Sequence, residues 1–204
     1  MKAFRALTAT AAVLDRPDVD TDQMVPKQFL KRIERTGYGE FLFHDWKQDP
    51  AFELNRPEYT GARILLAGPN FGCGSSREHA AWALEDYGFE VIVAPSFGDI
   101  FFTNAVQIGL VPIVLPLPEV KRLIESVAPG GELTVDLEAQ TIADSAGGVV
   151  SFEMDPFVRH CLLNGLDTIA RTLQREADIA AFEARAPSPV ATTALSDVGG
   201  VITQ

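Results

Sequence analysis

The chain has 204 residues, of which 47% are hydrophobic and 22% are charged, and its formal net charge is −11 at pH 7. This composition supports one hydrophobic core and excludes a disordered acidic polymer. The negative charge argues against a nucleic-acid surface, because phosphates need cationic partners. It does not exclude an anionic substrate, since a local arginine can outweigh a distant surface charge.

The start of the chain indicates where the protein acts. Its first residues lack the long apolar segment of a signal peptide. No apolar run approaches the ~20 residues that a membrane span needs. We therefore expect a cytoplasmic protein that does not contact a membrane.

The first expected strand covers residues 4–14, which are rich in small and β-forming side chains. A turn-rich segment with Asp18, Asp20 and Asp22 follows. A calcium loop would need a glycine at its sixth position and a glutamate at its twelfth, and both are missing. A turn and a helix cap before Pro26 are the simpler interpretation.

Residues 27–35 carry four cations, which is an exception in an acidic chain. One interpretation is the solvated face of a helix. The other is a mobile flap that brings cations to a dicarboxylate, with Gly37 and Gly39 as hinges. The flexible loop is expected over residues 27–46.

Residues 70–79 read Asn-Phe-Gly-Cys-Gly-Ser-Ser-Arg-Glu-His and join a strand-like apolar run at 64–67 to a helical pattern at 77–87. Gly72 and Gly74 free the backbone to curl, and Ser75 is the predicted N-cap. The unpaired N–H groups of a helix start suit an anion. Two hydroxyls and Arg77 at that point can bind a carboxylate.

A purely structural interpretation of the same residues stays open. Ser75-x-x-Glu78 also fits a capping box, in which both side chains only satisfy backbone donors. Two phosphate loops are excluded. A Walker loop needs Lys-Ser or Lys-Thr after the glycines, and Arg77 replaces the third glycine of a dinucleotide fingerprint.

The rest of the chain alternates strands and helices and then turns antiparallel. Parallel βαβ packing is predicted for the first part, and short antiparallel strands with a turn at residues 147–148 for the second. The last helical segment, residues 155–184, is broken at Gly165, and residues 187–204 are expected to be a disordered tail. The other expected strands are 90–94, 110–115, 132–137, 140–143 and 149–152, and the other helices are 96–108 and 118–127.

The chain has only two cysteines, Cys73 and Cys161, and three scattered histidines. Two thiols cannot supply the three or four ligands of an iron–sulfur cluster, and no other metal set is visible. We expect no metal on this chain. Cys73 is expected to line a cavity, and Cys161 to lie in the core.

At this point a family resemblance can be stated. The motif Gly-Ser-Ser-Arg-Glu-His after a strand resembles the swivel domain of the aconitase superfamily, and with residues 70–73 in front it resembles the small subunits of bacterial 3-isopropylmalate dehydratases. The resemblance runs from about residue 4 to about residue 187. The other matching segments are Asp20-Thr21-Asp22-Gln23, Pro26-Lys27-Gln28-Phe29-Leu30, Arg35-Thr36-Gly37-Tyr38-Gly39, Ala94-Pro95-Ser96-Phe97 and Arg159-His160-Cys161.

The resemblance implies an α/β fold, with one swivel-type β/β/α domain over residues 1–186 whose mixed, partly parallel sheet is flanked by helices. It implies a hydro-lyase of leucine biosynthesis that interconverts 2-isopropylmalate and 3-isopropylmalate through 2-isopropylmaleate. Two alternatives remain. One is the small subunit of a hydro-lyase for 2-methylmalate and citraconate, or for homoaconitate. The other is a non-enzymatic anion-binding module.

The resemblance also implies roles for single residues and for a partner. Ser75 is the base, and Ser76 and Arg77 bind a substrate carboxylate, with Arg35 as a second clamp. Glu78 and His79 orient the motif, and the segment Asp20-Thr21-Asp22 supports it. A separate large subunit completes a heterodimer and supplies the [4Fe–4S] cluster, and the substrate is a small dicarboxylate.

Overall fold

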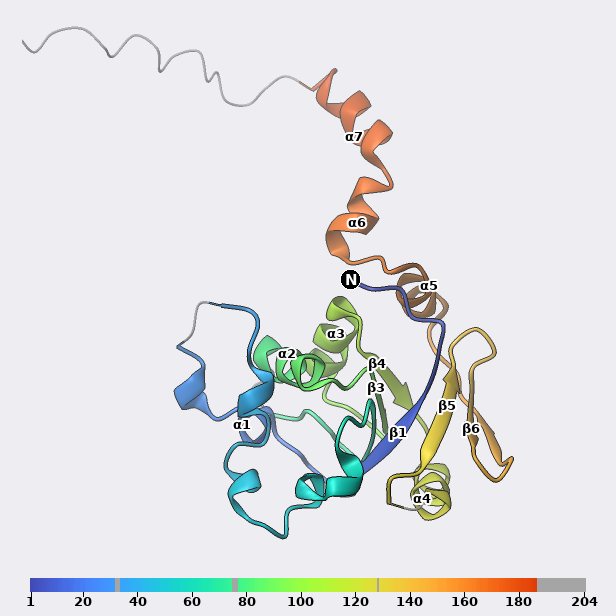
Figure 1. Ribbon diagram of the computed structural model, residues 1–204. Coiled ribbons are helices and arrows are strands. Elements are labelled where there is room, and N and C mark those ends of the chain that lie inside the picture. The colour runs from blue at the N-terminus through green and yellow to red at the C-terminus, as the bar shows by residue number, and fades with distance from the viewer. Residues whose placement is uncertain (32–33, 75–76, 128, 187–204) are drawn as a thin grey trace, which may run out of the picture. The chain divides into compact units, whose positions relative to one another are not determined.

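The computed structural model describes residues 1–31, 34–74, 77–127 and 129–186 (Figure 1). Its contacts divide the chain into two compact units, Met1–Asp167 and Thr168–Gln204. The predicted single domain over residues 1–186 stays a prediction. The tail predicted over residues 187–204 lies outside the described residues.

The first unit is built on a seven-stranded sheet with the order β4-β3-β2-β1-β5-β6-β7. β1 is the junction, because it pairs in parallel with β2 and antiparallel with β5. The predicted mixed sheet is therefore confirmed, and every strand begins and ends within two residues of its predicted position. The strands are β1 (Ala6–Leu14), β2 (Ile64–Ala67), β3 (Val91–Ala94), β4 (Val111–Val114), β5 (Glu132–Asp136), β6 (Thr141–Asp144) and β7 (Val149–Ser151).

The two faces of the sheet bury two separate cores. Successive side chains of a strand point to opposite faces, and a strand buried on both faces is apolar throughout. Leu65 and Ala67 of β2 share a core with α2 (Glu78–Tyr87) and α3 (Asp99–Ile108). Ile64 and Leu66 share the other core with α4 (Leu117–Ser126) and the antiparallel strands. Figure 1 shows α2 and α3 together on one side of β3 and β4.

The long connection from β1 to β2 contains one turn of α-helix and several short 3-10 helices. α1 (Thr21–Met24) is capped by the Asp20 side chain, and Gln23 completes a capping box, so the predicted cap before Pro26 is confirmed. The 3-10 helices are Lys27–Phe29, Gly39–Phe41, Trp46–Gln48, Glu53–Asn55 and Pro57–Tyr59.

One prediction about α2 is wrong. The helix begins at Glu78 with Arg77 as its N-cap, so Ser75 is not the cap. The reason is that the backbone of Arg77 is still extended, with φ −95° and ψ 139°. Glu78 is consequently the first helical residue, whereas a capping box needs its glutamate at the third helical position.

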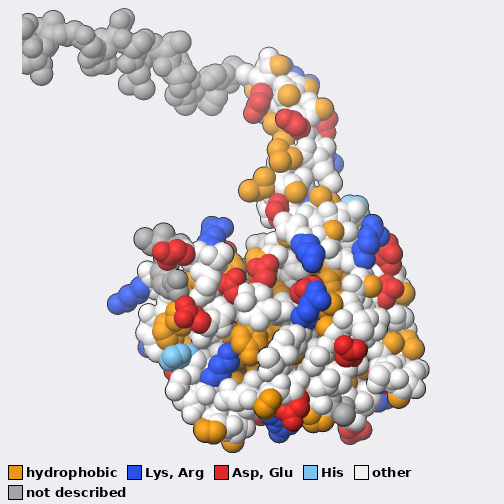
Figure 2. Space-filling view, viewed as in Figure 1, with side chains coloured by type: hydrophobic (Ala, Val, Ile, Leu, Met, Phe, Trp, Pro, Cys, Tyr) orange, Lys and Arg blue, Asp and Glu red, His pale blue; other side chains and the backbone are white. Residues whose placement is uncertain are grey.

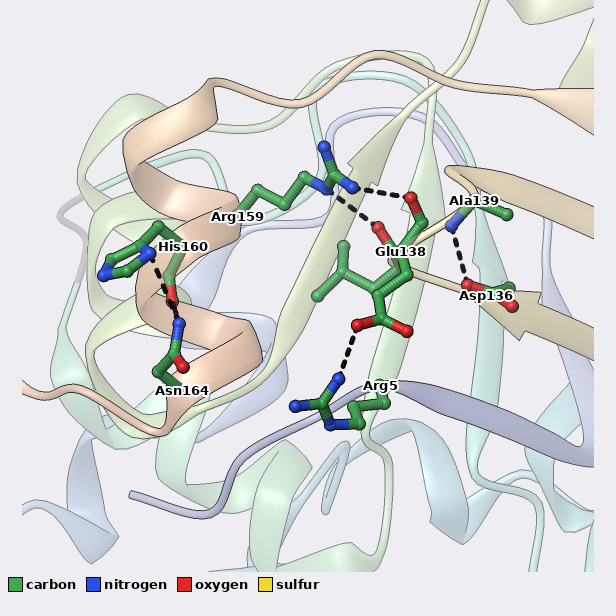
Figure 3. A network of polar contacts seen from close by, with 8 residues as sticks. Arg5, Asp136, Glu138, Ala139, Arg159, His160 and Asn164 are labelled. Carbon is green, nitrogen blue, oxygen red and sulfur yellow. Dashed lines mark hydrogen bonds and ion pairs between the residues drawn. The ribbon is translucent and has the colours of Figure 1, made fainter.

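The antiparallel strands are tied to α5 (Pro156–Asn164) by an arginine. Arg159 donates from Nε to the carbonyl oxygen of Leu137 at 3.1 Å and from Nη2 to that of Glu138 at 2.6 Å (Figure 3). Gly165 ends the helix in the left-handed conformation, with φ 66°, as predicted.

The second unit, where it is described, consists of α6 (Thr168–Leu173) and α7 (Glu176–Glu183). The expected helical segment thus has a second break, after Leu173. Apolar side chains of α6 and α7 are exposed: Ile169 is 72% exposed and Phe182 is 60% exposed. Figure 2 shows apolar side chains along these helices. None of the helices in the described part of the chain combines the length and apolar character that a membrane crossing needs.

Candidate active site at the glycine-rich turn

The turn after β2 lies between the connections that follow β1 and β3. Gly72 donates its backbone N–H to Val19 at 2.8 Å, and Phe71 donates to Ser96 at 3.0 Å. Isolated bridges also join Asp20 to Cys73 and Phe71 to Phe97. The turn is therefore held at the carboxyl ends of three parallel strands, which is where open α/β sheets bind ligands.

Both glycines of the turn are required by the space around them. Gly72 has φ 75°, and a Cβ there would lie 2.2 Å from the Cγ of Phe101. Gly74 has φ 88°, and a Cβ there would lie 2.1 Å from an oxygen of the Asp20 carboxylate. The predicted conformational reason for these glycines is confirmed, and close packing is a second reason.

The segment 20–22 supports the turn directly. Thr21 donates its N–H to the carbonyl oxygen of Cys73 at 3.1 Å. Asp22 Oδ1 lies 2.7 Å from Nη1 of Arg77, and both side chains are partly exposed. The two charges meet at the start of α2, beyond the carboxyl end of β2. Nη1 has no hydrogen-bond partner among the described residues, so the contact is an ion pair without hydrogen-bond geometry.

Cys73 is not arranged as a nucleophile. Burial raises the pKa of its thiol, and the negative charges of Asp20 and Asp18 raise it further. The thiol therefore stays protonated and unreactive near neutral pH. The prediction that Cys73 lines a cavity stays a prediction.

His79 lies among aromatic rings and not among acids. Its ring centroid is 4.7 Å from that of Trp82 and 5.1 Å from that of Tyr38. Burial lowers the pKa of the imidazole, an effect that Glu78 opposes and Arg77 reinforces. Within the described part of the chain, its Nδ1 is buried and has no hydrogen-bond partner. A neutral, packed ring is suited to orienting the motif.

The structure brings Arg35 to the same helix as Arg77. The guanidinium carbon of Arg35 lies 5.6 Å from the ring centroid of Trp82, within the usual range of a cation–π contact. Trp82 is five positions after Arg77 on α2. Ser75 and Ser76, the other predicted contacts, lie outside the described residues.

Sequence reasoning missed Trp82, Tyr38 and Asp86 as neighbours of the site. Tyr38 is fully buried, and its backbone N–H donates to Asp86 Oδ2 at 2.8 Å. A weak signal was present, because His79, Trp82 and Asp86 follow each other at helical spacing. Nothing local in the sequence pairs that helix face with a loop more than 40 positions away.

The described residues do not fit a metal cluster. Among them no group of three or more His, Cys, Asp or Glu side chains could hold a metal ion. Cys73 lies in the turn, whereas Cys161 is buried on α5. These two thiols do not form one ligand set.

Comparisons with known proteins place this chain in a family. The family model of the aconitase C-terminal domain matches residues 1–118, and the LeuD_N model matches residues 121–156. The 3-isopropylmalate dehydratase small subunit of Acidobacterium capsulatum is 56% identical over 185 residues, which cover 90% of each chain. The chain belongs to the family of 3-isopropylmalate dehydratase small subunits.

Other relatives of this family extend the match. The small subunit of Bacillus subtilis is 53% identical over 195 residues, covering 92% of this chain and 98% of that protein. A solved structure of 3-isopropylmalate dehydratase from Methanocaldococcus jannaschii is 25% identical and superposes with a TM-score of 0.66, covering 86% of this chain and 98% of that one. The implied swivel-type α/β fold is thereby confirmed.

Proposed function

We propose that this chain is the small subunit of a 3-isopropylmalate dehydratase, a hydro-lyase of leucine biosynthesis. The reaction interconverts 2-isopropylmalate and 3-isopropylmalate through 2-isopropylmaleate. The observation that carries the proposal is the 56% identity to a small subunit of that name over 90% of the chain. The cytoplasmic location expected from the sequence stays a prediction.

We assign the substrate contacts to the turn and the cationic loop. Arg77 and Ser76 bind one carboxylate, and Arg35 binds the other. The fork of a guanidinium matches a carboxylate, and Asp22 at 2.7 Å holds that of Arg77 in place. Holding both carboxylates keeps the two reacting carbons in reach of the same base.

Ser75 is the proposed base. It takes a proton from the carbon next to the one that loses hydroxide, and it returns a proton during rehydration. A serine takes a proton from carbon only as its alkoxide, and that anion needs positive charge nearby to stabilise it. Arg77 supplies such charge two positions along the chain.

The partner is the proposed large subunit. The cysteines of this chain do not fit an iron–sulfur cluster, so we place the [4Fe–4S] cluster of the superfamily on that subunit. The candidate turn then faces the interface between the two chains, and the substrate binds between them.

A substrate panel tests the proposed function. The chain is combined with its large subunit and assayed on 2-isopropylmalate, 2-methylmalate and homoaconitate. We expect the highest kcat/KM with 2-isopropylmalate. A preference for either other acid would make this a related hydro-lyase, and binding without turnover of any of them would favour an anion-binding module.

A Ser75→Ala variant tests the base. Turnover should fall by about 10²–10⁴, the usual contribution of a general base. Folding should be nearly unchanged, because α2 is capped at Arg77 and not at Ser75. Full turnover of the folded variant would remove Ser75 from the mechanism.

A further inference from the structure

The segment 27–46, here called the cationic loop, is fixed to α2 at Tyr38. The N–H of Tyr38 donates to Asp86 Oδ2 at 2.8 Å, and the Tyr38 side chain is fully buried. A Cβ on Gly39 would lie 2.8 Å from the backbone of Asp86 and Tyr87. Gly39 is thus a glycine of close approach, and its predicted role as a hinge stays a prediction.

The two arms of the loop are also fixed to each other. The ring of Phe29 stacks on that of Phe41 with centroids 4.2 Å apart, and His44 contacts Phe29 edge-on at 4.8 Å. Aromatic pairs of this geometry add stability beyond that of the apolar area that they bury. The segment predicted as a flexible loop, residues 27–46, therefore contains a packed aromatic contact between its two arms.

Arg35 is close to this anchor. Two residues separate it from Tyr38, so its Cα can lie no more than about 11 Å from that of the anchored tyrosine. Its guanidinium lies 5.6 Å from the Trp82 ring, which in turn packs against Tyr38 at 5.9 Å. Arg35 is exposed, and it is tied to α2 by the nearby backbone anchor at Tyr38 and by the contact of its guanidinium with the Trp82 ring.

We propose that Asp86 and Trp82 are positioning residues that hold the cationic loop against α2, with Arg35 placed to receive a dicarboxylate. The inference rests on the proposed function. Asp86 acts by fixing the backbone at Tyr38, and Trp82 acts by providing a surface on which the guanidinium rests. A loop fixed in this way binds substrate without first losing conformational freedom.

Three variants separate this role from a general loss of stability. Asp86→Ala removes the acceptor of the Tyr38 N–H, whereas Asp86→Asn keeps an amide oxygen that can accept the same bond. Glu85→Ala is the matched control. Glu85 is the neighbouring acid on α2, and it lines a cavity with Lys2 and Phe89, away from the cationic loop. Trp82→Phe keeps an aromatic face and tests the second contact.

Each variant is measured in two ways. Cleavage by trypsin after Lys31 and Arg35 reports on the loop in the chain by itself. The kinetics of the complex with the large subunit report on substrate binding. For Asp86→Ala we expect cleavage and KM for 2-isopropylmalate each to rise roughly 3- to 10-fold, the value of one hydrogen bond. kcat should change little, because a clamp that binds substrate and transition state equally affects KM.

Asp86→Asn should restore most of the wild-type KM, and Glu85→Ala should match wild type in both measurements. Unchanged cleavage in Asp86→Ala would overturn the proposal, and so would faster cleavage with an unchanged KM. A wild-type complex without isomerase activity would refute the proposed function instead, and the cleavage rates alone would then decide whether Asp86 anchors the loop.

Discussion

At the residue scale, conformation and close packing together explain why glycine is needed in the turn. Gly74 and Gly147 have the same φ of 88°, a conformation that side chains rarely adopt. They differ in their surroundings. A Cβ on Gly74 would meet the Asp20 carboxylate at 2.1 Å, whereas nothing lies within 4 Å of a Cβ on Gly147.

This pair predicts two different costs for the same substitution. Gly147→Ala should lower the free energy of unfolding by about 1–2 kcal/mol, the cost of a left-handed conformation. Gly74→Ala should lower it by about 1–3 kcal/mol more, because the turn or Asp20 must move, and it should also reduce turnover with the large subunit. Urea unfolding of both variants checks this. Equal costs would show that the contact with Asp20 is unimportant.

His79 predicts how stability depends on pH. Its pKa is lowered in the folded protein by burial, whereas in the unfolded chain it is near ~6.5. Below that pH the unfolded chain takes up a proton that the folded protein does not, so stability falls as pH falls. The fall ends once the pH passes the folded pKa, where both states are protonated.

The measurement is the free energy of unfolding of wild type and His79→Gln between about pH 7.5 and pH 5. The variant should be less sensitive to acid than wild type over this window. Parallel curves for the two proteins would mean that His79 is protonated as easily in the folded state as in the unfolded state.

At the scale of elements, the attachment of α5 depends on Arg159 more than on the surface ion pair beside it. Arg159 donates to two backbone carbonyl oxygens, whereas the side chain of Glu138 forms an ion pair with Arg5. The side chains of Arg5 and Glu138 are 65% and 58% exposed. Such exposed pairs contribute little, typically 0–1 kcal/mol.

We therefore predict that Arg159→Lys destabilises the protein by about 1–3 kcal/mol, because lysine lacks the planar fork that reaches both carbonyls. Glu138→Gln should change stability by less than about 1 kcal/mol. Thermal unfolding of the two variants tests the difference. A larger effect of Glu138→Gln would place the main attachment in the side-chain ion pair.

The elements themselves were largely predictable. A strand buried on both faces, such as Ile64–Ala67, is apolar throughout, and such a short apolar run can be recognised in the sequence. The start of α2 was not predictable, because the choice between Ser75 and Arg77 as cap depends on contacts of the turn with other loops. The contacts of Arg77 with Asp22 and of Arg35 with Trp82 join distant segments, so local patterns do not contain them.

At the scale of the whole molecule, the proposed function makes the chain one half of a dehydratase site. The described residues bring Arg77 and Arg35 to one helix, beside a turn held at the carboxyl edge of the sheet. Acidic and basic side chains are interspersed on the face seen in Figure 2. Expelling hydroxide from carbon needs a strong electrophile, and we place that group on the partner.

The most direct test is isomerisation of 2-isopropylmalate by the purified chain, alone and with a cluster-loaded large subunit under anaerobic conditions. The chain alone should be folded and inactive and should bind neither iron nor sulfide, and addition of the large subunit should restore turnover. Robust turnover by the isolated chain, or stoichiometric iron and sulfide bound to it, would contradict the account.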